Sequence, residues 1–408
     1  MHSVVIGAQW GDEGKGKIVD YLSEEADLVV RFSGGANAGH TIVTDGITYK
    51  LHLIPSGIVY PKTKVVLGSG MVIDPDSLFK ELKTITDQGI SWEGRVFISD
   101  RAHIVMPSYK QIDIDLEKER RFPIGTTGRG IGVTYSQKAQ REGIRVCDLG
   151  DSNFLKYLTK EEMDFLSPFI DRMKGMMIDL ASFMDNYSNK KVLFEGAQGI
   201  LLDLDIGTYP FVSSGYAAAA GASLGGGIGP RSIDTVFGVF KAYSTRVGNG
   251  PFPSEFLKER DGELEEYIRD LGREYGVTTG RPRRCGYLDL VALKYACRTN
   301  SIDHLVLTHI DVYDEIDEIK VCVAYEVDGK EITNFPSSRD MLAKATPILK
   351  SFKGWKENIS EVKNYDDLPL NAREYIKFIE DYTNTSIGII SVGYKREQTM
   401  MRTGLWTK

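Results

Sequence analysis

The opening stretch of the chain, residues 3–17, constrains the fold more than any other part of the sequence. Ser3 to Ile6 is a short apolar run with β-branched residues, which predicts a buried strand. A loop with four glycines follows, and the run KIVDYLSEE then predicts an amphipathic helix. Glycines in such a loop let backbone N–H groups approach phosphate oxygens, and the helix N-terminus adds its positive dipole. We therefore expect a phosphate-binding loop near the start of the chain.

This loop fits the spacing of a P-loop with one departure. Residues 11–17, GDEGKGK, match the pattern GxxxxGK. The next residue is Ile18, where a P-loop carries the Ser or Thr that holds magnesium. Asp12 could hold the magnesium ion instead, and Lys15 and Lys17 are expected to meet phosphates. The alternative is a strand–helix turn that merely requires glycine, with Asp12 as a turn residue and both lysines solvated.

Composition and charge exclude several classes of protein. The chain has 50 basic and 57 acidic side chains, and the net charge of -7 disfavours a nonspecific nucleic-acid or anionic-membrane binder. The sequence shows no signal peptide and no uncharged apolar run long enough to cross a bilayer, so we expect a cytoplasmic protein. Widely spaced cysteines without a CxxC pair predict neither a disulfide framework nor a zinc site; they are Cys147, Cys285, Cys297 and Cys322.

Short apolar runs alternate with helical stretches along the rest of the chain. This alternation predicts an α/β fold: a large, mostly parallel sheet flanked by helices, similar to a P-loop NTPase. We expect one domain, 1–408, with a helical insertion roughly at 101–190 and a hairpin-containing segment roughly at 312–365. Further expected strands are 28–32, 65–70, 96–99, 191–195, 236–242, 304–308 and 387–391, and further expected helices are 109–121, 261–275, 288–297 and 371–382.

Several polar, glycine-rich segments directly follow an apolar run. In an open α/β sheet, ligands bind outside the carboxyl ends of the strands. We therefore expect these segments to converge on one edge of the sheet and to form a long polar crevice there. The segments are 7–17, 33–41, 195–199, 243–250 and 308–311.

Six segments together resemble the adenylosuccinate synthetase family. They occur in the same order as in that family and spread over nearly the whole chain. The resemblance implies a GTP-dependent ligase that joins L-aspartate to IMP through 6-phosphoryl-IMP, in AMP biosynthesis. It also implies Mg²⁺, IMP, L-aspartate and GTP as ligands, and a homodimer. The segments are GAQWGDEGKGK, GGANAGHT, IGTTGRGIG, FEGAQGILLDLDIGTYPFV, KAYSTRVGNGPFP and GVTTGRPRRCGYLD.

The chemistry of this reaction needs a base and an acid. A base must remove the N1 proton of hypoxanthine so that O6 can attack a phosphoryl group, and an acid or cation must neutralise the developing charge. The resemblance assigns the base to Asp12, which also binds magnesium together with the carbonyl of Gly39, and the acid to His40. It places Gln198 at the purine edge. Taken alone, His40 could be a satisfied loop histidine, and Gln198 could bond the backbone.

The resemblance also implies three binding sets. The GTP site comprises Gly11, Asp12, Glu13, Gly14, Lys15, Gly16, Lys17, Gly39, His40, Thr41, Arg283, His309, Ile310, Asp311, Ser391, Val392 and Gly393. The IMP site comprises Asp12, Glu13, Gly14, Lys15, Asn37, Ala38, Gly39, His40, Thr127, Arg141, Gln198, Ser213 and Arg281. The aspartate site comprises Val277, Thr278, Thr279, Gly280, Arg281, Pro282 and Arg283.

Three of these residues also have a physical rationale. Arg281 and Arg283 suit a dicarboxylate because guanidinium forks pair bidentately with carboxylates, although a plain basic loop is the alternative. Asp311 suits guanine because a carboxylate can accept from both N1–H and N2–H₂. Arg141 is contributed by the other subunit in the family, whereas alone it would be read as a solvated charge.

The sequence departs from the family pattern around two pockets. Near the expected guanine pocket, His309 replaces the usual lysine, and Val392 and Tyr394 stand in a segment that usually reads STGP. On the IMP side, Ser213 replaces threonine at the start of SSGYAAAAGA, which is less polar than the usual segment, and Ala36 replaces a common histidine.

These departures leave three hypotheses. The first is the synthetase that acts on IMP with GTP. The second is a paralogue that uses ATP or a related deoxy or 2-amino purine nucleotide. The third is a guanine-nucleotide-binding protein without ligase activity, which the missing Ser or Thr at Ile18 and the dicarboxylate-type loop argue against.

Overall fold

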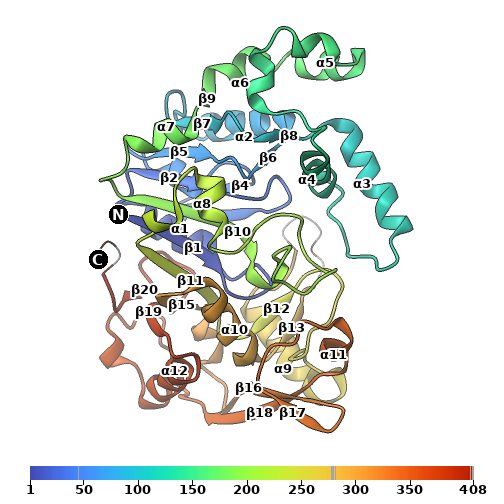
Figure 1. The fold of residues 1–408 in the computed structure, drawn as a ribbon. Helices are drawn as coiled ribbons and strands as arrows, with labels where there is room; N and C mark the ends of the chain where they lie inside the picture. The colour runs from blue at the N-terminus through green and yellow to red at the C-terminus, as the bar shows by residue number, and fades with distance from the viewer. Residues whose placement is uncertain (45, 277–279, 281, 405, 407–408) are drawn as a thin grey trace.

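A ten-stranded sheet forms the centre of the molecule in the computed structural model, which describes residues 1–44, 46–276, 280, 282–404 and 406 (Figure 1). Nine strands are parallel, and only the pairing of β19 with the edge strand β20 is antiparallel. In sheet order the strands are β20 (Thr399–Met401), β19 (Ser386–Ser391), β15 (His304–Thr308), β11 (Thr235–Lys241), β1 (His2–Gly7), β10 (Val192–Gly199), β2 (Leu28–Arg31), β5 (Lys64–Leu67), β7 (Val96–Ser99) and β9 (Met177–Ile178).

Both faces of this sheet are buried, which explains why its strands read as continuous apolar runs. Successive side chains of a strand point to opposite faces. In β1, Val4 and Ile6 belong to one core cluster, with side chains of α7, α8, α10 and α12, whereas Val5 belongs to the other, with side chains of α1, α2 and α6. These helices are α1 (Lys15–Ser23), α2 (Pro75–Asp87), α6 (Ile170–Met176), α7 (Leu180–Asp185), α8 (Gly221–Gly226), α10 (Leu290–Asn300) and α12 (Leu370–Thr383).

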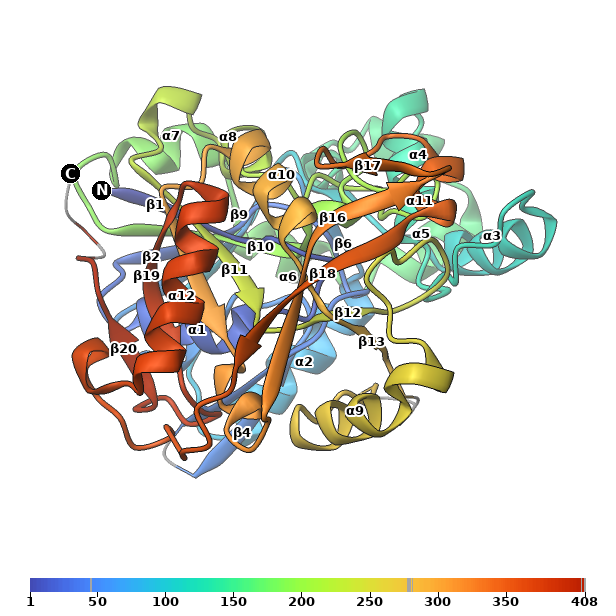
Figure 2. The same ribbon diagram turned by 90° about the horizontal axis from the view of Figure 1, so that it is seen from below.

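Two groups of elements lie around the central sheet, and the second group contains a separate four-stranded sheet. In the expected helical insertion, α3 and α4 project together from one side of the molecule, with α5 above them (Figure 1). In the expected hairpin segment, the long strands β16 and β18 cross the molecule beside α12 (Figure 2). The elements are α3 (Pro107–Glu119), α4 (Ile131–Gln140), α5 (Lys160–Leu166), β14 (Leu288–Asp289), β16 (Glu318–Val327), β17 (Lys330–Ile332), α11 (Arg339–Lys344) and β18 (Thr346–Lys353).

The remaining elements are a helix and three small strand pairs. The hairpin of β3 and β4 begins inside a segment that the sequence predicts as a loop. The sequence does not predict these strands because they alternate exposed and buried residues and do not form an apolar run. The elements are β3 (His40–Thr44), β4 (Ile47–Leu51), β6 (Val72–Ile73), β8 (His103–Ile104), β12 (Ser244–Arg246), β13 (Arg284–Gly286) and α9 (Lys258–Leu271).

The fold class is as expected from the sequence: a large, mostly parallel sheet flanked by helices, with antiparallel hairpins added. We propose that the chain is one domain, since β1 and β20 from opposite ends of the sequence belong to the same sheet. Within the residues that the structure describes, no helix has the length and apolarity needed to cross a bilayer.

Candidate functional site

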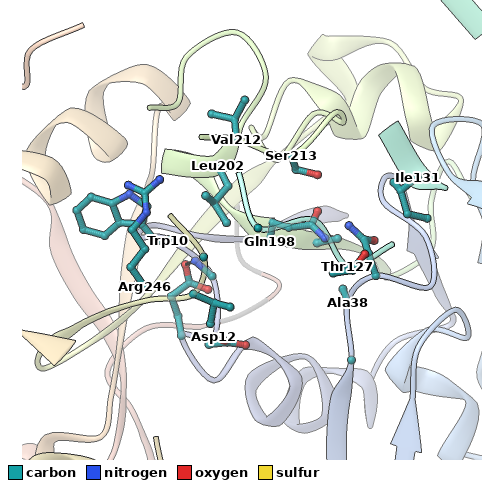
Figure 3. A pocket seen from close by; sticks show the side chains of 18 of the residues that line it. Trp10, Asp12, Ala38, Thr127, Ile131, Gln198, Leu202, Val212, Ser213 and Arg246 are labelled. Atoms are coloured by element: carbon teal, nitrogen blue, oxygen red, sulfur yellow. Dashed lines mark hydrogen bonds between the residues drawn. The ribbon is translucent and has the colours of Figure 1, made fainter. Parts of the chain in front are cut away.

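A cavity of about 500 Å³ lies where β1, β2 and β10 end (Figure 3). Four of the polar segments that the sequence analysis singled out contribute to its wall, and two further segments join them. The expected convergence on one edge of the sheet is therefore present for these segments. The lining residues come from 10–17, 37–41, 124–127, 195–198, 211–214 and 246–249, with Arg31, Asp113, Arg120, Ile131, Gly132, Leu202 and Arg283.

The phosphate-type loop has a backbone that few residues tolerate. Gly11, Asp12 and Gly14 have φ values of 89°, 57° and 84°, all in the left-handed region. Glycine adopts that region freely, and aspartate does so more readily than most other residues. Gly14 is the N-cap of α1, so the N-terminus of this helix opens into the cavity that the loop lines.

Glu13 folds back beneath this loop and organises it. Its side chain is fully buried, and its Oε1 accepts a hydrogen bond from the Gln9 N–H at 3.1 Å. Its Oε2 pairs with Lys15 Nζ at 2.6 Å. A Cβ at Gly7 or Gly199 would lie 2.4 Å from a Glu13 oxygen, so glycine is required at both positions. These glycines make room for a buried carboxylate, not for a phosphate.

Asp12 is 38% exposed and is paired with one arginine. Its Oδ2 lies 3.2 Å from Arg283 Nε, and another guanidinium nitrogen of Arg283 donates to Glu274 at 2.8 Å. Glu274 is buried and also accepts from Lys241 Nζ at 2.7 Å. Burial acts to raise the pKa of Glu274, but Lys241 and His309 outweigh it and bring the pKa to about 2. An ionised Glu274 therefore holds Arg283 beside Asp12.

His40 contributes a neutral imidazole to the same cavity. Burial, with smaller contributions from Arg31, His52 and Lys15, lowers the pKa of His40 to about 3. Its Nε2 lies 3.7 Å from Oε1 of Glu195, a carboxylate whose pKa is raised by its own burial. An imidazole beside a carboxylate is suited to exchange a proton with a bound ligand.

The residues expected around a purine nucleotide reach the cavity from several loops. Gln198 lies near the end of β10 with a φ of 58°, which turns the backbone at that point. Thr127, Ser213 and Ala38 line the same cavity from separate loops (Figure 3). Asn37 also belongs to the lining.

Helix α3 fixes the loop that carries Thr127. The buried Asp113 accepts from the Gly130 N–H at 2.9 Å and from Thr126 Oγ1 at 3.0 Å. Glu117 accepts from the Gly125 N–H at 2.6 Å. Two carboxylates of one helix therefore hold both ends of this short loop.

The expected guanine residues lie outside the lining of this cavity. His309, Ile310 and Asp311 follow β15, whereas Ser391, Val392 and Gly393 end the neighbouring strand β19 and begin the turn after it. Lys17 lines the cavity, and its Nζ donates to Ser391 Oγ. Lys17 thus connects the phosphate-type loop with this second group.

The expected aspartate loop is only partly described. Val277, Thr278, Thr279 and Arg281 lie outside the described residues, so their assignment stays a prediction. Gly280 has a φ of 63°, and its N–H donates to Gly276 O at 2.7 Å, while Pro282 forms a bridge with Tyr275. Of the expected aspartate-binding residues, Arg283 lines the cavity.

Arg141 lies away from the cavity of its own chain. It is the C-cap of α4, with an exposed side chain and a φ of 69°. It is absent from the cavity lining, in contrast to Thr127 on the loop before α4. The contact between Arg141 and IMP stays a prediction.

Three charged residues of the lining were not assigned to the site individually from the sequence. Arg31 and Glu195 are single charges inside otherwise apolar strands, and such isolated charges were the available signal. Arg246 lies over the Trp10 ring, 5.6 Å from its centroid, and donates to Pro251 O at 2.7 Å. The segments that contain Glu195 and Arg246 were both expected at the site, but nothing local distinguishes Arg246 within its segment.

The residues at the cavity fit a magnesium ion shared with phosphates. No group of three or more His, Cys, Asp or Glu residues within the described parts of the chain could hold a metal. Magnesium, however, binds through one or two protein oxygens and completes its shell with water and substrate phosphates. Asp12 and Gly39 both line the cavity and offer a carboxylate and a carbonyl oxygen.

Comparison with known proteins identifies the family. Residues 4–400 match the family model described as adenylosuccinate synthetase. The chain belongs to the adenylosuccinate synthetase family. The adenylosuccinate synthetase of Clostridium novyi (strain NT) is 48% identical over 423 residues, which cover 98% of this chain and 98% of the relative. That of Aquifex aeolicus (strain VF5) is 47% identical over 420 residues, which cover 97% and 96%.

Solved structures of this fold agree. A fully ligated adenylosuccinate synthetase from Plasmodium falciparum superposes with a TM-score of 0.91 at 39% identity, and covers 98% of this chain and 99% of its own. The succinoaminodeoxyadenylate synthetase of cyanophage S-2L, bound to dGMP and dATP, has a TM-score of 0.65 at 20% identity and covers 99% and 95%. At that identity the second likeness shows the fold alone, and it does not favour the paralogue hypothesis.

Proposed function

We propose that this chain uses GTP to join L-aspartate to IMP, giving adenylosuccinate, GDP and phosphate. Family membership makes the chain a ligase that forms a carbon–nitrogen bond in AMP biosynthesis. The observation that supports this activity best is the placement of Asp12 and His40. They come from loops after different strands of the sheet, and both line one cavity beside the N-terminus of α1.

In the first step, the carboxylate of Asp12 takes the N1 proton of IMP. The freed electron pair makes O6 nucleophilic, O6 attacks the γ-phosphorus of GTP, and GDP leaves. The left-handed backbone at Asp12 supports this role because it places the carboxylate, 38% exposed, at the cavity instead of beneath the loop. The adjacent Glu13, whose backbone is not strained in this way, is buried and serves the loop.

We assign magnesium to the oxygens of Asp12 and Gly39. When bound, the ion neutralises charge on the phosphates during transfer. The chain's own residues supply the rest: the N-terminus of α1 orients the phosphates. Arg283, which pairs with Asp12 in the structure, adds positive charge to the cavity wall.

In the second step, the amine of aspartate attacks C6 of 6-phosphoryl-IMP, and phosphate leaves with the electron pair of the C6–O6 bond. The proton that the amine loses balances the proton that the leaving phosphate gains. His40 is the proton donor to the phosphorylated oxygen, and Gln198 orients the purine edge. Glu195, 3.7 Å from His40 Nε2, supports this role because its carboxyl group, whose pKa is raised by burial, can return a proton to the neutral imidazole.

The direct test combines product formation with a nucleotide panel. Purified protein, aspartate and magnesium should form adenylosuccinate from IMP and GTP, with ATP and dGMP as the alternative donor and acceptor. A strong preference for GTP and IMP supports the proposal. Absence of adenylosuccinate with the native oligomer would contradict it, and efficient use of ATP or dGMP would favour the paralogue hypothesis.

We further propose a homodimer in which Arg141 completes the IMP site of the partner. Its exposed position outside its own cavity supports this assignment. Helix α3 lies beside α4 (Figure 1), and it carries exposed large apolar side chains that an interface could cover. They are Ile112, Ile114 and Leu116, which are 42%, 41% and 44% exposed.

A further inference from the structure

We propose that Lys17 is a positioning residue for the guanine pocket and that its ammonium holds the turn after β19 instead of a phosphate. This inference rests on the proposed use of GTP. It departs from the P-loop pattern, which places the phosphate-binding lysine at Lys17.

The hydrogen bonds of Lys17 carry this inference. Its Nζ donates to Ser391 Oγ at 2.7 Å, to Gly393 O at 2.7 Å and to Gln398 O at 3.2 Å. A lysine ammonium has three donors, and all three have acceptors on this one turn. A phosphate would have to displace charge-assisted hydrogen bonds to reach Lys17.

Lys15 provides the contrast. Its Nζ pairs with Glu13 Oε2 at 2.6 Å, inside the same loop. That single contact leaves donors of the Lys15 ammonium available at the cavity that both lysines line. The phosphate role therefore fits Lys15, two residues before the position that the motif indicates.

The turn held by Lys17, residues 391–398, is closely fitted around it. Gln398 O accepts from the Val392 N–H at 3.0 Å as well as from Lys17. A Cβ at Gly393 would lie 2.3 Å from Gln398 Oε1, so a larger residue there would force the Gln398 side chain to move. Without the ammonium, Ser391 Oγ, Gly393 O and Gln398 O would each lose one charge-assisted hydrogen bond.

The turn lies next to the residue that suits guanine. Strands β15 and β19 are parallel neighbours, with Leu307 paired to Ile390, so Asp311 and Ser391 leave the sheet at the same edge. Burial lowers the pKa of Lys17 to about 8, while Asp311 acts in the opposite direction. Lys17 is therefore mostly charged at pH 7, and it lies close enough to Asp311 for the two charges to interact.

The test measures binding of the guanine base and binding of the phosphates of GTP separately. Guanosine and inorganic tripolyphosphate serve as competitors against GTP. Lys17→Met should raise the inhibition constant of guanosine at least about tenfold and change that of tripolyphosphate by less than about twofold, because the loss of charge-assisted bonds falls on the base pocket. At saturating GTP, kcat should fall little, and the KM for IMP should stay unchanged.

Two controls define the comparison. Lys395→Met removes an exposed lysine from the same turn and should leave both inhibition constants unchanged. Lys15→Met should weaken tripolyphosphate and spare guanosine. If Lys17→Met does not fold, Lys17→Gln takes its place, because its amide keeps two hydrogen-bond donors. We expect Lys17→Gln to raise the inhibition constant of guanosine by a smaller factor.

One result would overturn the assignment: Lys17→Met or Lys17→Gln weakens tripolyphosphate as much as GTP while guanosine binding is unchanged. Calorimetry measures the binding of both competitors as dissociation constants and does not require enzyme activity. If the wild-type protein binds guanosine but forms no adenylosuccinate, the proposed function is contradicted. The Lys17 variants would still show whether Lys17 serves the base pocket or the phosphates.

Discussion

At the scale of single residues, Asp12 combines an unusual backbone with a side chain directed at the cavity. Its φ of 57° is one that asparagine also tolerates, whereas most other residues would add strain. Asp12→Asn is therefore the substitution that removes the base without disturbing the loop. Alanine would confound the loss of the carboxylate with backbone strain.

We expect Asp12→Asn to reduce kcat by roughly 10³-fold or more, because it removes both a general base and a metal ligand. Initial rates of adenylosuccinate formation at saturating substrates measure this effect. The melting temperature should change little, since the pair with Arg283 is partly exposed. A kcat near that of the wild type would show that another group accepts the N1 proton.

A second expectation concerns the buried pair of Lys241 and Glu274. Both side chains are at most 1% exposed, and their charged atoms are 2.7 Å apart. Lys241→Met would leave Glu274 buried without its main cation and should lower the free energy of unfolding by about 3 kcal/mol, as measured by urea denaturation. Lys377→Met breaks an exposed pair and should change it by less than about 0.5 kcal/mol. Equal effects of the two variants would contradict this account.

At the scale of elements, the start of α10 contains a buried carboxyl group whose pKa is raised. Asp289 is the N-cap of α10 and accepts from the Ala292 N–H at 2.9 Å and from Tyr325 OH at 2.6 Å. Burial raises the pKa of Asp289 to about 6. A raised pKa means that the folded state favours the neutral form, so this group's contribution to stability is complete below its unfolded pKa and is lost as the pH rises through about 6.

We expect Asp289→Asn to flatten the dependence of stability on pH between about 4 and 6, since the amide does not titrate. The wild type should lose about 3 kcal/mol relative to the variant across this window. Melting temperatures at several pH values measure the difference. Asp381→Asn, which replaces an exposed carboxyl group on α12, should show the same dependence of melting temperature on pH as the wild type. Parallel curves for Asp289→Asn would refute the raised pKa.

At the scale of the whole molecule, the proposed IMP site is incomplete in one chain. Arg141→Leu should mainly raise the KM for IMP. When it is mixed with Asp12→Asn, hybrid dimers contain one site with neither defect, so part of the activity should return. Subunit exchange followed by rate measurements tests this expectation. Failure of two well-folded variants to complement each other, despite proven exchange, would contradict a shared site.

The sheet was predictable because both of its faces are buried. Val4, Val5 and Ile6 form an unbroken apolar run, and such runs mark the central strands. The β3–β4 hairpin was missed because its residues alternate between exposed and buried over only a few positions. The glycine loop was predictable in the same local way, since its chemistry lies within one short segment.

Relations between distant residues could not be predicted. From the sequence, Glu13 is predicted to bind phosphate with the rest of its loop. In the structure its side chain is buried beneath the loop, against Gly199. The contact of Lys17 with Ser391 joins positions 374 residues apart, and no local pattern marks it. The predicted assignments of Thr127, Ser213 and Asn37 to one cavity have support from position, but their contacts with IMP stay predictions.

The order of strands in the sheet has a consequence for synthesis on the ribosome. Strand β1 is made first, yet it pairs with β10 and β11, which end at Gly199 and Lys241. The phosphate-type loop that follows β1 therefore lacks at least one of its two neighbouring strands until more than half of the polypeptide has been translated. Such long-range pairing slows folding and leaves apolar strands exposed. A nascent chain shorter than this should bind chaperones and not nucleotide.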